Sequence, residues 1–382
     1  MNLDFDETQL MLRTQARDFI SEKSPTILVK EVVLTEQGYS PEVWREMADL
    51  GWMSIPFAEE YGGAEMTFFE VLLILEEMGR GSLPGPYLST MLCGMVISKF
   101  GSQVQKERYL PEIVSGEKIF ALAMTEPSAG LKPGDFKFKA TKGLGPKYAL
   151  TGTKLFCPDA HIADYFLVIA RTSPATTDDN TVGISLFITP AKGPGIIVYP
   201  QDSIAFDNQS QIELVNQVVG EEDMVGNLDR GWLIVEQIIA WGAIAKCAEM
   251  IGAMGKAFEM SLDYAKERVQ YGKSIGTYQK QQHRLADMWI ALEGCRNFFY
   301  EVGWQVGNGE NDQLNISSAK AMISDMAEEL ADQATLLHGA IGLTWDYDLG
   351  LLFRRIRGAA LMFGDRRYHR DQIVRVLESQ TK

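Results

Sequence analysis

The strongest constraint on the fold is a long run of helical periodicity that begins near Leu228 and continues to about Tyr271. Read as a single helix, this segment would contain roughly 44 residues and would be about 65 Å long at 1.5 Å per residue. A helix of that length needs neighbours along its flanks, from the same chain or from other subunits. The sequence therefore predicts a four-helix-bundle-like domain over residues 228–382.

A different helical pattern occupies residues 1–118. Ser40 followed by Pro41 is a typical helix start, and the segment from Thr67 to Glu70 has the form of a capping box. The segment Tyr87 to Phe100 is nearly all apolar, which predicts a buried helix. We therefore expect an N-terminal helical domain.

Between these helical parts, residues 119–227 alternate with a period of two, and Phe136–Lys139 is one of the predicted strands. The connections are too short for helical crossovers, so the sheet should be antiparallel, as a sandwich or a barrel. The predicted fold class is α+β, with domains at 1–118, 119–227 and 228–382.

Composition disfavours several functions. The 51 acidic and 36 basic side chains give a net charge of −15, which disfavours binding to nucleic acids and to anionic membrane surfaces. No apolar run approaches the ~20 residues needed to span a bilayer, and the first residues lack a basic signal-peptide region. The cysteines and histidines show no metal-ligand spacing, so we expect buried thiols, no metal site and a cytoplasmic protein.

Five short segments in a fixed order carry the functional information. They are Thr125–Gly130, Gly152–Phe156, Arg268–Gly272 followed by Gln279, Leu285–Met288, and His338–Gly342. Together, on this helix–sheet–helix plan, they resemble the acyl-CoA dehydrogenase family along essentially the whole chain. The resemblance implies a flavoprotein that uses FAD to introduce an α,β double bond into a CoA thioester and passes the electrons to electron-transferring flavoprotein.

The resemblance also implies roles for individual residues. Thr125 and Phe156 match positions that line the flavin within one subunit, whereas Arg268 matches an arginine that reaches the FAD pyrophosphate of the neighbouring subunit. A guanidinium suits that role because it is permanently charged and binds bidentately. The residues expected to accompany Arg268 on this surface are Gln270, Tyr271, Ile275, Gln279 and Gly339. Without the family, Phe156 would be an ordinary inward strand residue and Arg268 a solvated residue at a helix end.

Both positions at which the family carries its catalytic base are empty. The usual glutamate precedes the glycine that corresponds to Gly364, and here that position is Phe363. The alternative position on the long helix is Gly242, and Ala243 replaces the arginine beside it. Neither side chain can accept a proton. The small residues around Gly242 would leave room for a bulky acyl group or would allow a tight helix crossing.

Other departures affect the flavin site and the surface offered to the neighbour. Leu131 and Lys132 replace a serine and an aspartate, and Pro158 replaces a threonine that normally contacts flavin N5. On the neighbour's side, Leu336 replaces a glutamine and Ala340 a glycine. Each lost hydrogen bond should weaken cofactor binding by ~1 kcal/mol or more.

Two carboxylates could replace the missing base. Asp365 lies beside the flavin in family terms, and Glu249 is seven residues beyond Gly242 on the same helix face. Each has a structural alternative: Asp365 could pair with Arg366, Arg367 or His369, and Glu249 could form an ion pair in the bundle or at an interface.

Three functions follow from these observations. The favoured one is a partner subunit, lacking its own base, in an α2β2 acyl-CoA dehydrogenase, as in bacterial assemblies of two related chains such as those that act on steroid side chains. The second is a self-sufficient homotetramer that uses Asp365 or Glu249. The third is a non-redox or structural family member.

Overall fold

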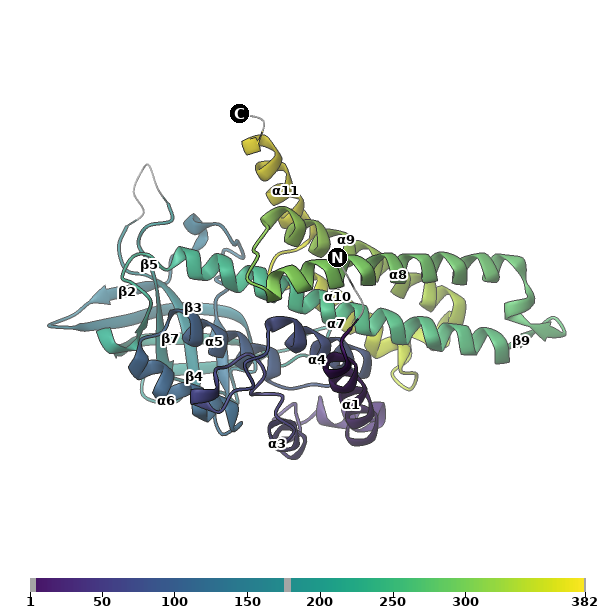
Figure 1. Ribbon diagram of the computed structural model, residues 1–382, viewed down its shortest axis with the longest axis horizontal. Coiled ribbons are helices and arrows are strands. Elements are labelled where there is room, and N and C mark those ends of the chain that lie inside the picture. The colour runs from purple at the N-terminus through teal and green to yellow at the C-terminus, as the bar shows by residue number, and fades with distance from the viewer. Residues whose placement is uncertain (1–4, 175–179, 381–382) are drawn as a thin grey trace.

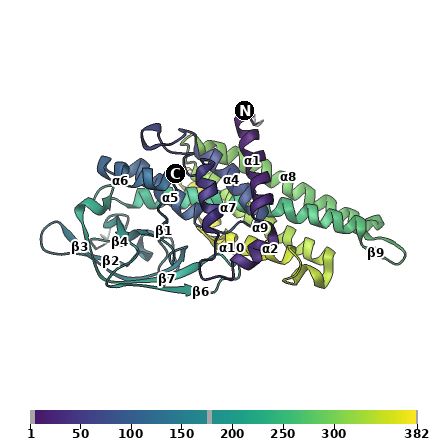
Figure 2. The same ribbon diagram turned by 90° about the horizontal axis from the view of Figure 1, so that it is seen from below.

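The computed structural model describes residues 5–174 and 180–380, and it has three parts (Figure 1). A twisted sheet lies at one end, a helical bundle extends to the other, and the N-terminal helices pack against the bundle between them. Figure 2 shows the same arrangement from below. The expected α+β class, with a helical, a β and a second helical part, is confirmed.

The N-terminal part is helical, as predicted. Its helices are α1 (Glu7–Lys23), α2 (Thr26–Val32), α3 (Pro41–Asp49), α4 (Phe68–Gly81), α5 (Tyr87–Phe100) and α6 (Gln103–Val114), with a short 3₁₀ turn η1 (Glu59–Tyr61). Ser40 caps α3, and Thr67 and Glu70 form the capping box of α4. Most of α5 is buried. The helix starts predicted from the capping residues and the buried helix predicted from the apolar run are therefore confirmed.

The middle part is an eight-stranded sheet with the strand order β6-β7-β3-β2-β4-β5-β8, and β1 pairs with β4. Its strands are β1 (Phe120–Ala123), β2 (Lys139–Lys142), β3 (Lys147–Pro158), β4 (Tyr165–Arg171), β5 (Ile184–Pro190), β6 (Ile196–Gln201), β7 (Gln209–Gly220) and β8 (Met224–Val225), with 3₁₀ turns η2 (Pro133–Asp135) and η3 (Glu221–Asp223). Most strand pairs are antiparallel, as expected. The pairs β1–β4 and β2–β4 are parallel, which the sequence did not predict.

The strand predicted at Phe136–Lys139 is wrong, because β2 begins only at Lys139. The backbone N–H groups of Lys137 and Phe138 donate to the Glu126 carboxylate, at 2.7 and 3.0 Å, rather than to a strand. Phe136 and Phe138 are both buried. Their alternation therefore reflects burial in an irregular segment and not a pleated strand.

The C-terminal part is built around α7 (Trp232–Glu267), which has 36 residues rather than about 44. The remaining elements are β9 (Val269–Gln270), β10 (Lys273–Ser274), η4 (Ile275–Thr277), α8 (Gln279–Gly307), α9 (Gln313–His338), η5 (Gly339–Leu343), α10 (Leu349–Leu361) and α11 (Arg366–Gln380). Tyr271 and Gly272 link β9 to β10 and both have positive φ, as a tight hairpin turn requires. This hairpin stops the helix that periodicity alone extended to Tyr271.

The apolar character of α7 reflects its position in the core. The expectation that no segment is apolar enough to span a bilayer is wrong for α7, because this helix passes that test by length and composition. However, 94% of its most apolar stretch is buried inside the fold. The helix crosses α4 at close range, because a Cβ added at Gly252 would overlap backbone atoms of Glu76 and Arg80. All four cysteines are free and buried, as expected.

Candidate functional site

Two cavities meet where the sheet, α7 and the segment after α10 come together. The outer cavity has a volume of about 590 Å³ and its walls include Thr125, Phe156, Leu361 and Asp365. The inner cavity, of about 80 Å³, lies between α4, α5, α7 and α10. Six residues border both: Leu122, Pro158, Asp207, Gln209, Met362 and Phe363.

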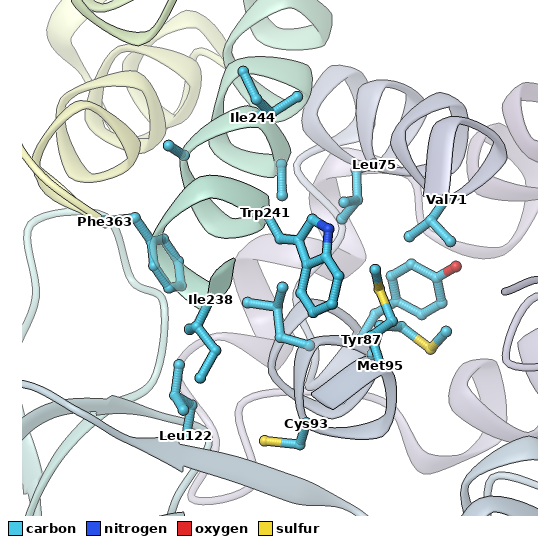
Figure 3. Packing of buried hydrophobic residues seen from close by; sticks show 14 of the residues in the cluster. Val71, Leu75, Tyr87, Cys93, Met95, Leu122, Ile238, Trp241, Ile244 and Phe363 are labelled. Atoms are coloured by element: carbon cyan, nitrogen blue, oxygen red, sulfur yellow. The ribbon is translucent and has the colours of Figure 1, made fainter. Parts of the chain in front are cut away.

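Phe363 and Gly242, the two vacant base positions, are in direct contact. The Phe363 ring is directed towards α7 near Ile238 and Leu122 (Figure 3), and the residue is 8% exposed. A Cβ added at Gly242 would lie 2.5 Å from ring atom Cε1 and closer still to Cγ and Cδ1. The two family positions therefore share one space, and an aromatic ring fills it.

A buried network holds the backbone of this segment. His369 Nε2 donates to the Phe363 carbonyl at 3.0 Å, and Nδ1 lies 3.2 Å from Ser317 Oγ. Burial lowers the pKa of His369 to about 4, so the ring is neutral and its single proton is on the nitrogen that faces the carbonyl. Lys320 Nζ donates to the carbonyls of Ala359 and Ala360, and burial lowers its pKa to about 8.

Asp365 is exposed on the wall of the outer cavity. Its Oδ1 accepts a hydrogen bond from the Tyr368 backbone N–H at 2.8 Å, so the carboxylate caps the start of α11. Arg366, a partner expected from the sequence, instead pairs with Asp325 and Glu328. The carboxylate faces the cavity region without an ion-pair partner among the residues that the structure describes.

Glu249 lies on the wall of the inner cavity and forms an ion pair with Lys246 at 2.8 Å. This is the bundle ion pair considered as its structural alternative. Seven residues separate Glu249 from Gly242, which corresponds to roughly 10 Å along the helix axis. Glu249 and Asp365 therefore lie on different cavities.

The outer cavity carries the residues expected to contact a flavin from within the subunit. Phe156 is 52% exposed and has a φ of 51°, because the pairing of β3 with β7 is irregular between Lys154 and Cys157. Such an irregularity turns a side chain out of the pleat. The alternative that Phe156 is an ordinary inward residue is wrong. Its exposed ring, together with the exposed apolar Leu361, fits a flat aromatic group in a cavity of this size.

A buried ion pair that sequence analysis did not single out supports this wall. Lys154 is fully buried, and its Nζ donates to Glu126 Oε1 at 2.9 Å and to the Met124 carbonyl at 3.0 Å. Desolvation lowers the pKa of Lys154, and the Glu126 charge opposes that effect. The rings of Phe136 and Phe138 lie 5.5 and 5.1 Å from the ammonium. The sequence feature that could have revealed this ion pair was a lysine within the segment Gly152–Phe156, in the part of the chain that alternates with a period of two.

The second set of predicted cofactor residues lies at the far end of α7, where Figure 1 shows β9 at the tip of the bundle. Arg268, Gln270, Tyr271, Gln279 and Gly339 are exposed there, and Ile275 is buried. Arg268 is about 39 Å along the helix axis from Gly242. These residues and Phe156 therefore do not face a common cavity within one chain, and their role towards a neighbouring subunit stays a prediction.

No group of three or more His, Cys, Asp or Glu side chains within residues 5–174 and 180–380 could hold a metal ion.

Family models match all three parts of the chain. The N-terminal, middle and C-terminal domain models of acyl-CoA dehydrogenases match residues 6–117, 121–218 and 229–378. The fold, the outer cavity and these matches define the class of protein. It is an FAD-dependent oxidoreductase that acts on a CH–CH bond, and this expectation is confirmed.

Individual relatives support the assignment over nearly the whole length. An acyl-CoA dehydrogenase of Bacillus subtilis is 32% identical over 355 residues, which cover 91% of this chain and 92% of the relative. A 3-(aryl)acrylate reductase of Clostridium sporogenes is 31% identical over 366 residues, with coverages of 94% and 96%. The structure of butyryl-CoA dehydrogenase from Megasphaera elsdenii superimposes with a TM-score of 0.90 at 26% identity, over 99% of this chain and all of the other. The chain belongs to the acyl-CoA dehydrogenase family.

Proposed function

We propose that this chain is the partner subunit of an α2β2 acyl-CoA dehydrogenase, in which a related second chain supplies the catalytic base. The observation that carries this proposal is the contact between Phe363 and Gly242. One apolar ring fills the space that serves both customary base positions. A proton acceptor for the substrate C2 position must therefore come from another residue or another chain.

The retained residues fit a role in holding FAD. Thr125 and Phe156 would contact the flavin ring system in the outer cavity, and Lys154 with Glu126 would keep that wall in place. Arg268 would bind the pyrophosphate of the cofactor held by the neighbouring subunit. When bound, FAD supplies the acceptor for the hydride that leaves the β-carbon of the thioester.

Phe363 would act by shape rather than by proton transfer. Its ring separates the inner from the outer cavity and is nine-tenths buried, so it would exclude water from the region beside Gly242. Exclusion of water strengthens electrostatic interactions at the reacting carbons and prevents side reactions.

A self-sufficient homotetramer is the second candidate, and the position of Asp365 favours it. This carboxylate is exposed on the outer cavity, where the predicted flavin-lining residues also lie. Glu249 is a weaker candidate for the base, because it is paired with Lys246 and lies about two helical turns from Gly242.

The remaining parts of the proposal follow from the family. The substrate would be an acyl-CoA thioester, and the electron acceptor would be electron-transferring flavoprotein. The assembly would resemble the bacterial ones that degrade steroid side chains or other lipids, in the cytoplasm.

Expression of the chain alone and together with a co-encoded paralogue tests the proposal. Flavin absorbance, assembly mass and acyl-CoA oxidation should show little bound flavin and no turnover for the chain alone. The co-expressed pair should be a yellow, active heterotetramer. An active homotetramer would contradict the proposal.

If the chain alone is active, the Asp365→Asn variant identifies its base. Asparagine caps helices about as well as aspartate, so α11 should stay intact while the proton acceptor is lost. Loss of turnover with unchanged assembly would then establish the second candidate.

A further inference from the structure

The inner cavity has two chemically different walls. Its N-terminal wall, from α4 and α5, is mostly apolar and includes Leu75, Leu88 and Leu92. The opposite wall, from the ends of β3 and β7 and from α7 and α10, combines apolar residues such as Met250 and Ile356 with seven polar or charged side chains. These are Asp159, Asp207, Asn208, Gln209, Lys246, Glu249 and Arg355. A purely hydrocarbon acyl chain would offer no hydrogen bond to any of them.

Several polar atoms on that wall are buried and have no hydrogen-bond partner within the described parts of the chain. They are the acceptors Asp207 Oδ1 and Gln209 Oε1 and the donor Arg355 Nε. Gln209 is only 7% exposed, and its amide nitrogen already donates to Asp207 Oδ2 at 2.9 Å. Because each buried unsatisfied polar group costs ~1–3 kcal/mol, a ligand that satisfies them gains affinity.

The charges on the wall decide which ligand fits. Lys246 and Arg355 are opposed by Asp207, Glu249 and Asp159, so the fully ionised set has a net charge of −1. Burial raises the pKa of Asp159 to about 7, which brings the net charge closer to zero at neutral pH. Such a wall does not attract a carboxylate. A neutral hydroxyl group suits it, because one hydroxyl donates to Asp207 or Gln209 and accepts from Arg355.

We propose that the inner cavity binds the distal part of an acyl group that carries a hydroxyl group beyond the reacting carbons. This inference rests on the proposed function only in that the chain binds CoA thioesters. The inner cavity, of about 80 Å³, is much smaller than the outer cavity of about 590 Å³, so it suits a short polar segment better than a long tail.

The position of the hydroxyl follows from α7. Lys246 is four residues, or about 6 Å, beyond Gly242 along the helix axis. An extended chain advances roughly 1.2 Å per bond, so about five bonds span that distance. Counted from a substrate C2 atom level with Gly242, five bonds lead to the oxygen of a hydroxyl group on the sixth carbon, so the hydroxyl group of a 6-hydroxyhexanoyl thioester would reach the polar wall.

Calorimetric titration of the FAD-loaded protein, with its paralogue where one is required, tests this inference. The probes are hexanoyl-CoA, 6-hydroxyhexanoyl-CoA and adipoyl-CoA. We expect 6-hydroxyhexanoyl-CoA to bind about tenfold more tightly than hexanoyl-CoA, as one additional buried hydrogen bond to an unpaired group predicts. Adipoyl-CoA should bind no more tightly than hexanoyl-CoA, because its carboxylate meets a wall with no net positive charge.

Variants of residues on the polar wall test whether this wall causes the preference for the hydroxylated thioester. Gln209→Leu and Asp207→Asn should each reduce the preference for the hydroxylated thioester to about twofold. Gln211→Leu is the matched control, since Gln211 lies two residues further along β7 and borders neither cavity. It should leave the preference unchanged.

Equal binding of the hexanoyl and 6-hydroxyhexanoyl thioesters would mean that ordered water alone satisfies the wall, and it would overturn the inference. Tighter binding of adipoyl-CoA, or an unchanged preference in both wall variants, would overturn it as well. Turnover measured on the same samples tests the partner-subunit role separately from the hydroxyl preference. Activity without a paralogue contradicts the partner-subunit role but not the hydroxyl preference.

Discussion

Substitution of Gly242 by alanine should reveal that both base positions share one space. The new Cβ would lie 2.5 Å from Phe363 Cε1, and real Cβ atoms essentially never approach a neighbour within 3.0 Å. Overpacking of this kind costs ~1–3 kcal/mol. The exchange of glycine for alanine inside a helix gains ~1 kcal/mol. The Gly242→Ala variant should therefore lose between about 0 and 2 kcal/mol of unfolding free energy.

Removal of the Phe363 ring should make Gly242→Ala stabilising instead of destabilising. In a Phe363→Ala background the clash is absent, so Gly242→Ala should gain about 1 kcal/mol from helix propensity alone. The coupling energy between the two substitutions is then about 1–3 kcal/mol. Phe363→Ala itself should cost less than the ~3–5 kcal/mol typical of a core phenylalanine, because its ring borders two cavities rather than a closed core.

Chemical denaturation of the four proteins of this double-mutant cycle measures the coupling. Gly294→Ala in α8 is a matched control, because a Cβ added there meets no atom within 4 Å. It should stabilise both backgrounds equally. If Gly242→Ala also changes stability by the same amount with and without the Phe363 ring, to within about 0.5 kcal/mol, the shared-space argument is refuted.

Four further outcomes are expected. Phe363→Glu should restore acyl-CoA oxidation to an assembly whose paralogue has lost its own catalytic base, because it returns a carboxylate to the family's usual position; flavin bleaching under anaerobic conditions measures it. Lys154→Met should cost about 3–5 kcal/mol and release FAD, since it leaves the Glu126 carboxylate buried without its cation; denaturation and flavin fluorescence report both effects. The folded pKa of His369, about 4, lies below its unfolded value near 6.5, so its contribution to stability is complete above pH 6.5 and is lost as the pH falls towards 4; His369→Gln should flatten this part of the stability profile. Arg268→Ala should lower FAD retention in the assembled protein at least tenfold without changing the stability of the isolated chain, as flavin release by dilution would show.

Features that lie within a few residues of each other predicted the helices and strands of this fold well. The errors arose where contacts between distant segments decide the structure. Thr67 and Glu70 are only three residues apart, so their capping box could be recognised in the sequence. The error at Phe136 and Phe138 arose because their backbone partner, Glu126, comes from another segment. The helix at α7 was predicted to be too long because the hydrophobic pattern contains no information about backbone angles, and Tyr271 and Gly272 take positive φ.

The same distinction applies to the site. The identity of Phe363 and Gly242 revealed that no base is present at either position, since that information lies in residue type alone. Their contact could not be predicted, because 121 positions separate them and only the fold brings them together. The polar wall of the inner cavity was also not predicted. Asp207 and Arg355 belong to none of the family segments, and their unpaired atoms become visible only when every other hydrogen bond is assigned.

The contact between Phe363 and Gly242 also constrains how such a chain could regain a base. A glutamate at position 242 needs the volume that the ring now fills, so that substitution alone would overpack α7. A glutamate at position 363 meets no such barrier, because a glycine faces it and the His369 hydrogen bond engages only the backbone carbonyl. One substitution at 363 is therefore sterically accessible, whereas a base at 242 requires two changes. A family member with its base on the long helix should accordingly carry a small residue at the position of Phe363.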